Sequence, residues 1–147
     1  MWASGPGKRL AAARQSFREM PLVLAMDGAE LRGVMDLVFE GADGQWEVLD
    51  YKTSAPAPVR AAAAEYQWQL GLYAVAASRW LGHPVRRWTV YFLGTGQPVE
   101  RTVGPDDLAL AEDVAREALA GIAGRQFGRA SSRTCPHCRF RRLCEGG

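Results

Sequence analysis

The chain lacks several features that would assign it to a common class of protein. Its three cysteines all lie between Cys135 and Cys144, so they do not form a disulfide framework. It has no run of about 18 or more apolar residues, which argues against a membrane-spanning helix. The N-terminal segment contains no apolar core and does not form a secretory signal. We therefore expect a cytoplasmic protein that makes no contact with a membrane.

The total charge of the chain does not single out a partner, because the net charge is only +2. A hydrophobic content of 48% is enough for a folded core. We expect a single domain over residues 1–147, with a core at about 17–125 and an arginine- and cysteine-rich tail at 125–147. The tail contains no acidic residue between Arg125 and Arg142. It can contact phosphate groups, or it is simply a solvated basic segment.

The pattern of apolar residues and turn residues predicts the order α-β-β-β-α-β-β-α. An Asp27-Gly28 turn indicates a hairpin between the first two strands. This order predicts an α/β (α+β-like) fold, with a central mixed sheet flanked by helices. The expected helices are 8–19 (ended by Pro21), 59–81 and 105–123, and the expected strands are 22–26, 30–39, 45–51, 87–93 and 98–103.

The aromatic residues of the long helix and the fourth strand are expected mainly in the core. Trp68 and Trp80 fall on the helix, and Trp88 falls on the strand. Trp46 lies beside a GADG turn and is expected to be partly exposed. Stacking on nucleic-acid bases is the alternative use of such rings.

Three charged residues near the middle of the chain predict a site. Asp50 and Lys52 are two apart on a strand, so their side chains point to the same face, and a hairpin can bring Asp36 beside them. An aspartate within an apolar strand is costly to bury unless it is paired or binds a metal. Two carboxylates and a lysine suit a divalent metal and a water that becomes a nucleophile. A salt bridge from Lys52 to one aspartate on a solvated face is the alternative.

Three short motifs follow one another in a recognisable order. Residues 33–36 (GVMD) form a GxxD motif, residues 50–53 (DYKT) form a DxK motif, and residues 69–73 (QLGLY) form a QxxxY motif on one face of a helix. Together they resemble the nuclease domain of RecB- and AddA/AddB-type helicase–nucleases, within the PD-(D/E)xK superfamily. The resemblance covers about residues 17–144.

The resemblance implies a restriction-endonuclease-like core and a metal-dependent nuclease. It implies cleavage of DNA, with single-stranded DNA as the expected substrate and an exonuclease mode, during double-strand-break repair and recombination. A helicase domain or subunit is the implied partner, because the chain contains no GxxxxGK[ST] motif for ATP. Asp36 and Asp50 would hold Mg²⁺ or Mn²⁺. The backbone carbonyl of Tyr51 and the carboxylate of Glu19 are further candidate ligands.

The remaining motif residues receive catalytic and DNA-binding roles from the same resemblance. Lys52 would orient or activate the attacking water and stabilise charge in the transition state. Gln69 and Tyr73 would support the site and contact DNA. In the tail, the candidates for DNA contact are Arg139, Arg141 and Arg142.

One residue that the family usually carries is missing. Relatives have a further histidine on a helix upstream of the first strand, facing the metal. The histidines here are His83, expected on a surface turn, and His137, among the cysteines. An excised C-terminal nuclease domain that has lost that helix would account for the difference. The alternative function is a catalytically inactive DNA-binding or scaffold module of such a complex.

The cysteines of the tail form a second candidate site. Cys135, Cys138 and Cys144 have the spacing CxxC-x5-C, which resembles the last three ligands of the iron–sulfur cluster in AddB-type nucleases. A [4Fe–4S] cluster requires four ligands, so it is expected only with a fourth ligand from outside this chain. Zinc bound with the help of His137 and reduced cysteines without metal are the alternatives.

Overall fold

The computed structural model describes residues 4–53, 59–126 and 141. The chain divides into two compact units, Met1–Arg116 and Glu117–Gly147, and the first contains the whole sheet. None of the described helices is long and apolar enough to cross a membrane. A single domain over residues 1–147 stays a prediction.

The described residues contain nine helices and strands. The long helix predicted at 59–81 is interrupted at Glu65 and Tyr66, which separate two helices. The other elements follow the predicted order, although some begin or end elsewhere. They are α1 (Gly5–Ala11), β1 (Gln15–Met26), β2 (Ala29–Glu40), β3 (Trp46–Lys52), α2 (Val59–Ala64), α3 (Gln67–Leu81), β4 (Val85–Phe92), β5 (Gln97–Thr102) and α4 (Pro105–Ala123).

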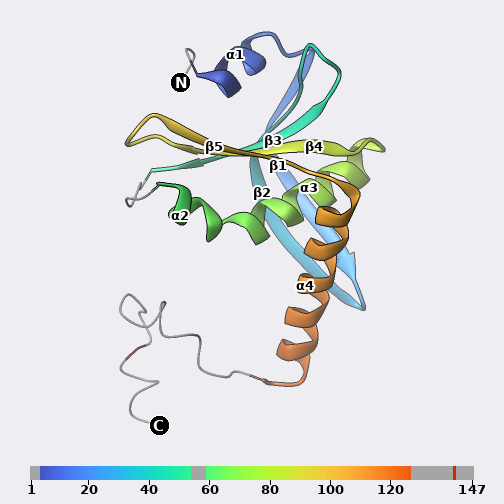
Figure 1. Cartoon of the computed structure of the whole chain (residues 1–147). Coiled ribbons are helices and arrows are strands. Elements are labelled where there is room, and N and C mark those ends of the chain that lie inside the picture. Colours follow the sequence, from blue (N-terminus) through green and yellow to red (C-terminus); the bar gives the residue numbers. More distant parts are fainter. Residues whose placement is uncertain (1–3, 54–58, 127–140, 142–147) are drawn as a thin grey trace. The chain divides into compact units, whose positions relative to one another are not determined.

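The five strands form one sheet in the order β1-β2-β3-β4-β5. Strands β3 and β4 are parallel, and the other neighbouring pairs are antiparallel. Because a parallel pair needs a crossover connection, α2 and α3 fill the interval between β3 and β4. Helix α1 lies on one face of the sheet and α2 and α3 lie on the other (Figure 1). The predicted central mixed sheet flanked by helices is therefore confirmed.

The predicted helix at 8–19 is wrong over most of its length. Helix α1 ends at Ala11, and the residues from Gln15 onward pair with β2 as far as Met26. Pro21, which was expected to end a helix, lies inside β1, where an edge strand tolerates its missing N–H group. The predicted hairpin turn is confirmed, since Asp27 and Gly28 have φ values of 48° and 80°, as a two-residue turn requires.

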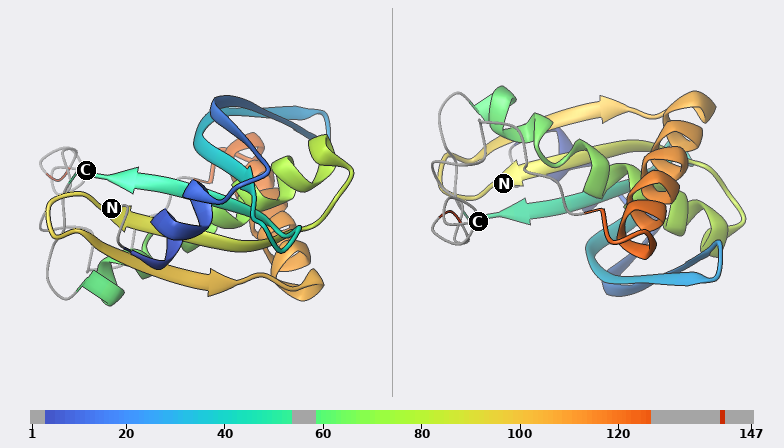
Figure 2. Two further views of the ribbon diagram at one scale, coloured as in Figure 1. Left: turned by 90° about the horizontal axis from the view of Figure 1, so that it is seen from above. Right: turned by 90° about the horizontal axis from the view of Figure 1, so that it is seen from below.

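The two faces of β3 have different roles. On the face that α1 covers, Leu49 packs with Leu37, Phe39 and Tyr91, and Leu10 of α1 lies against them. Asp50 and Lys52 alternate to the opposite face, which α3 crosses (Figure 2). The hydrophobic cluster thus fixes the strands from one side while the other side holds the polar residues of the candidate site.

The aromatic residues depart from expectation at three positions. Trp46, expected to be partly exposed, is buried and stacks with Phe17 at a centroid distance of 6.2 Å. Trp68 and Trp80, expected in the core, lie on α3 and are exposed. Composition alone could not distinguish the buried from the outward side of this helix. Trp88 is buried, as predicted.

Gly71 allows α3 and α4 to approach closely. A Cβ atom at Gly71 would lie 2.9 Å from the Cβ atom of Ala111, which is too close for two carbon atoms. We expect Gly71→Val to lower the free energy of unfolding by about 2 kcal/mol, because the two helices must separate. Urea denaturation measures the change.

The matched control is Gly121→Ala, also in a helix, where an added Cβ atom meets nothing within 4 Å. This variant is expected to gain up to about 1 kcal/mol from helix propensity. Equal destabilisation by both substitutions would contradict the close approach.

Candidate active site

Asp36 and Asp50 come together where the ladder between β2 and β3 ends. The last pair toward this end is Leu37 with Leu49, and the next step along both strands reaches the two aspartates. Here a side chain takes the place of a backbone acceptor, because the N–H of Tyr51 donates to Oδ2 of Asp36 at 2.8 Å. This bond fixes the half-buried carboxylate of Asp36 beside β3.

Asp50 is a buried carboxylate with unusual surroundings. It is 3% exposed, and Nζ of Lys52 lies 2.7 Å from its Oδ2 atom as an ion pair. Within the described residues, that oxygen has no well-aligned hydrogen bond. Burial raises the pKa of Asp50, the ammonium of Lys52 lowers it, and the nearby Asp36 carboxylate raises it further. An oxygen atom held this way has capacity for another cationic partner.

Lys52 connects the strand to α3. Its Nζ atom donates to Oε1 of Gln69 at 3.3 Å, and Nε2 of Gln69 donates to the hydroxyl of Tyr73 at 2.6 Å. The same Nζ atom lies 4.5 Å from the ring centroid of Tyr66. The structure therefore places Asp50, Lys52, Gln69 and Tyr73 in one continuous set of contacts.

Sequence reasoning missed Tyr66. The available signal was an aromatic residue three positions before Gln69, which is about one helical turn. The interruption between α2 and α3 could not be predicted from the alanine-rich composition, and it is this interruption that contains Tyr66.

Glu19 is more exposed than the two aspartates. It lies between the paired residues Arg18 and Met20 of β1, opposite Asp36, and its side chain is exposed. Within the described residues, no group of three or more His, Cys, Asp and Glu side chains lies close enough to hold a metal ion. Its backbone is nevertheless unusual, with a φ of 49°. Such a conformation is strained for a residue other than glycine and is often found near functional sites.

The strain at Glu19 gives a testable expectation. Glu19→Gly should raise the free energy of unfolding by about 1 kcal/mol, because glycine adopts a positive φ without a steric penalty. Glu19→Ala keeps the strained backbone and serves as the control, with little change expected. Thermal denaturation of both variants measures the difference, and equal midpoints would contradict a strained backbone at this position.

Of the other sequence-predicted residues, His83 lies away from this set of contacts. His83 is exposed in the turn before β4, as predicted. That turn lies beside Trp46, at the start of β3, which is about 13 Å along the strand from Asp50. Of the tail candidates, Arg141 is exposed. Those that fall outside the described residues are Cys135, His137, Cys138, Arg139, Arg142 and Cys144.

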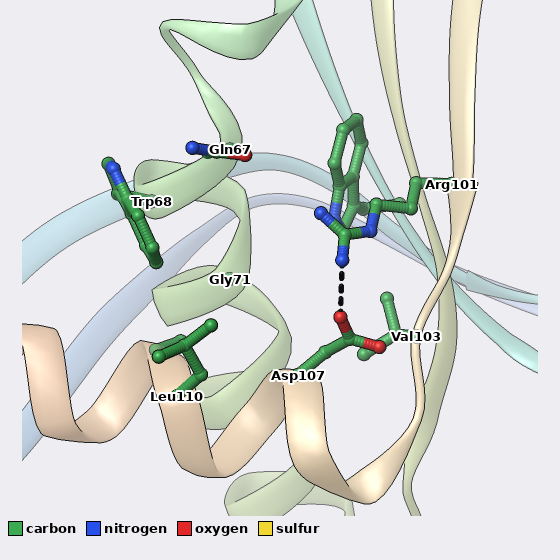
Figure 3. Close-up of a pocket in the computed structure, with 9 residues that line it drawn as sticks. Gln67, Trp68, Gly71, Arg101, Val103, Asp107 and Leu110 are labelled. Carbon is green, nitrogen blue, oxygen red and sulfur yellow. Dashed lines mark hydrogen bonds and ion pairs between the residues drawn. The ribbon is translucent and has the colours of Figure 1, made fainter.

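A small pocket lies apart from the candidate site. It has a volume of about 60 Å³, and α3, β4, β5 and the first turns of α4 line it (Figure 3). Its walls include the rings of Trp68 and Trp88 and the ion pair between Arg101 and Asp107. This pocket does not extend the candidate site, because its lining includes none of Asp36, Asp50, Lys52, Gln69 and Tyr73.

The donor atoms at the candidate site suit a hard divalent cation. Mg²⁺ and Mn²⁺ prefer oxygen ligands, and Mg²⁺ is usually bound through one or two carboxylates while it keeps several waters. Asp36 and Asp50 provide two carboxylates at one point of the sheet. The buried Oδ2 atom of Asp50, which has no aligned hydrogen bond within the described residues, is the observation that fits a divalent cation at this point.

Comparison with known families agrees with this chemistry. The sequence model of the PD-(D/E)XK nuclease superfamily matches residues 4–145. Since this match spans almost the whole sequence, the chain belongs to the PD-(D/E)XK nuclease superfamily, as its motifs predicted. Superfamily members generally use divalent metals such as Mg²⁺.

Curated relatives are much longer than this chain. An ATP-dependent helicase/nuclease subunit of Desulforamulus reducens is 31% identical over 113 residues, which cover 67% of this chain and 9% of the relative. The protein of the same name from Pelotomaculum thermopropionicum is 34% identical over 110 residues, which cover 63% of this chain and 9% of the relative. The chain thus corresponds to a small part of these relatives.

A solved structure supports the fold. The crystal structure of SSO0001 aligns with a TM-score of 0.57 at 17% identity and covers 88% of this chain and 59% of that one. At this identity the likeness concerns the fold alone. The predicted restriction-endonuclease-like α/β fold is confirmed.

Proposed function

We propose that this chain is the nuclease domain of an ATP-dependent helicase–nuclease that acts in DNA repair and recombination. It would be a divalent-metal-dependent deoxyribonuclease that degrades DNA, preferentially single strands, as an exonuclease. The observation that carries the proposal is the continuous set of contacts from Asp50 through Lys52 and Gln69 to Tyr73, with Asp36 beside it. The similarity to helicase/nuclease subunits supports the helicase partner.

Two carboxylates hold the metal in this proposal. Asp36 and Asp50 bind Mg²⁺ or Mn²⁺, which when bound supplies a nucleophilic water and charge neutralisation at the phosphate. Asp36 is kept in position by the N–H of Tyr51. The carbonyl of Tyr51 and the carboxylate of Glu19 are proposed as further ligands.

Lys52 would orient or activate the attacking water and stabilise negative charge on the phosphate. Its ammonium contacts Asp50 in this structure, so it would lie beside the proposed metal and the phosphate bound there. There it would offset negative charge that develops in the transition state, with Gln69 retaining it by a hydrogen bond. Gln69 and Tyr73 would also contact the DNA strand.

The proposal extends to the tail and to the location of the protein. Arg139, Arg141 and Arg142 are proposed to contact DNA phosphates, which requires only their charge. A [4Fe–4S] cluster on Cys135, Cys138 and Cys144 stays a prediction that requires a fourth ligand from outside this chain. A cytoplasmic location, a single domain over 1–147 and its core at about 17–125 also stay predictions.

A cleavage assay with labelled single-stranded and duplex DNA tests the function. We expect cleavage in the presence of Mg²⁺ or Mn²⁺. Asp50→Ala should lower the rate by about 1,000-fold or more, because it removes a proposed ligand of the metal. Lys52→Ala should lower it by at least about 100-fold, because it removes a positive charge that stabilises the transition state. A wild-type rate no higher than that of both variants would contradict the nuclease proposal.

The second candidate is an inactive DNA-binding module. It is favoured by the position of His83, the one histidine among the described residues, at the opposite end of β3 from the aspartates. Gel-shift measurements on the same samples separate the two functions. Retarded DNA without metal-dependent cleavage would support the inactive module.

A further inference from the structure

We propose that Tyr66 is a positioning residue that keeps the ammonium of Lys52 beside Asp50. This inference rests on the proposed nuclease function and adds a residue that the three motifs do not contain. Tyr66 would act through Lys52, by an interaction between the positive charge and the face of its ring.

The ammonium group of Lys52 makes three contacts. Oδ2 of Asp50 lies at 2.7 Å, Oε1 of Gln69 lies at 3.3 Å, and the ring centroid of Tyr66 lies at 4.5 Å. A cation within about 6 Å of an aromatic centroid is attracted by the negative face of the ring. The side chain of Lys52 is only 20% exposed, so water screens this attraction little.

The backbone holds the ring of Tyr66 in place. Tyr66 lies at the junction of α2 and α3, where its N–H donates to the carbonyl of Ala63 at 3.1 Å and its carbonyl accepts from Leu70 at 3.0 Å. Its ring also packs against Phe92 of β4, at a centroid distance of 6.5 Å. The ring is thus fixed from both the helix and the sheet.

A fixed ring matters because lysine is flexible. The lysine side chain has four rotatable bonds and loses much rotamer freedom when it is ordered. Asp50 and Gln69 attract the ammonium, and the contact with the ring of Tyr66 limits its other positions further. We therefore expect Tyr66 to affect the rate of the chemical step more than the binding of DNA.

Paired substitutions at Tyr66 test the proposal. Tyr66→Phe keeps the ring and should retain the wild-type kcat. Tyr66→Leu removes the ring and should lower kcat about 2- to 30-fold, with KM and the thermal midpoint nearly unchanged. In a Lys52→Ala background, measured by single-turnover kinetics, Tyr66→Leu should cause no further loss, because the residue through which it acts is absent. A wild-type kcat in Tyr66→Leu, or an equal loss in both backgrounds, would overturn the proposal.

A second measurement does not depend on nuclease activity. Lys8 and Lys52 are the only two lysines of the chain, so mass spectrometry can follow the acylation of each by an amine-reactive reagent. Lys8 is exposed and serves as an internal reference. Acylation of Lys52 relative to Lys8 should be several-fold faster in Tyr66→Leu than in the wild type and unchanged in Tyr66→Phe.

Together the two measurements distinguish a failure of the proposed role of Tyr66 from a failure of the proposed nuclease function. Equal acylation of Lys52 in the wild type and Tyr66→Leu would overturn the role of Tyr66, even where the wild type cleaves DNA. A wild type that shows no cleavage, but whose Lys52 is protected by Tyr66, would overturn the proposed function and leave the positioning contact intact.

Discussion

Replacing Asp50 by asparagine is expected to abolish cleavage and, at neutral pH without metal, to make the protein more stable. Asp50 is almost fully buried, and burial raises its pKa despite the nearby Lys52. The fold therefore disfavours the charged carboxylate, and a neutral amide of the same shape removes that penalty. We expect a gain of about 1 kcal/mol in the free energy of unfolding, which corresponds to a thermal midpoint about 2–4 °C higher.

The pH dependence of this gain follows from the raised pKa. In the unfolded chain Asp50 titrates near 3.8, and in the folded chain it retains its proton to higher pH. At low pH the wild type is therefore about as stable as the variant. As the pH rises from 3.8 through the folded pKa of Asp50, the wild type becomes less stable than the variant. The two proteins should melt together below that range, and the asparagine variant should melt higher above it.

A divalent metal should reverse the order of the thermal midpoints of the wild type and Asp50→Asn. Binding to the folded state stabilises a protein, by about 2.7 kcal/mol when the ligand is at 100 times its Kd. Mg²⁺ should raise the thermal midpoint of the wild type much more than that of Asp50→Asn. Asp113→Asn, at an exposed position on α4, is the matched control and should respond as the wild type does. Equal metal responses of wild type and Asp50→Asn would contradict metal binding at Asp50.

Replacing Glu47 by alanine is expected to be the most destabilising change. Glu47 is 2% exposed and lies on the face of β3 opposite Asp50. Its Oε2 atom accepts from Nε of Arg9 at 2.9 Å and from Arg87 at 3.0 Å, and its Oε1 atom accepts from Arg9 at 2.8 Å and from Thr89 at 2.9 Å. The hydrogen bonds to Glu47 raise the pKa of Arg9 above its already high ordinary value.

Removal of this carboxylate leaves several donors without their partner. We expect a loss of about 3 kcal/mol, because breaking a buried ion pair from one side leaves the other charge uncompensated. The thermal midpoint should fall by about 10 °C. Glu100→Ala is the control, since Glu100 also pairs with Arg9 but is more exposed, and it should cost less than about 1 kcal/mol. Equal losses in the two variants would contradict the role of Glu47 as the buried partner of Arg9 and Arg87.

The candidate site was predictable because its motifs depend on local geometry. Residues two apart on a strand share a face, and residues four apart on a helix share a face, so Asp50 with Lys52 and Gln69 with Tyr73 could be grouped from the sequence. The GADG turn fixed the return of the chain and brought Asp36 to the same place. Their roles in catalysis stay predictions, although their placement agrees with them.

Other features depend on contacts that sequence spacing does not encode. The network of Glu47 joins α1 and β4 to β3 across 38 and 40 residues, and nothing local indicates those partners. Pro21 suggested the end of a helix, but pairing with β2 extended β1 through it. Long-range strand pairing outweighs local propensity in such segments.

The single-turnover rate of DNA cleavage by the wild-type chain, with Mg²⁺ and with the metal removed by a chelator, tests the central claim most directly. Asp36→Asn at equal DNA occupancy provides the comparison. The proposed site predicts cleavage that requires Mg²⁺ and that falls about 1,000-fold or more in the variant. Cleavage that persists without metal, or that is the same in Asp36→Asn, would contradict a metal-dependent nuclease site built on these two aspartates.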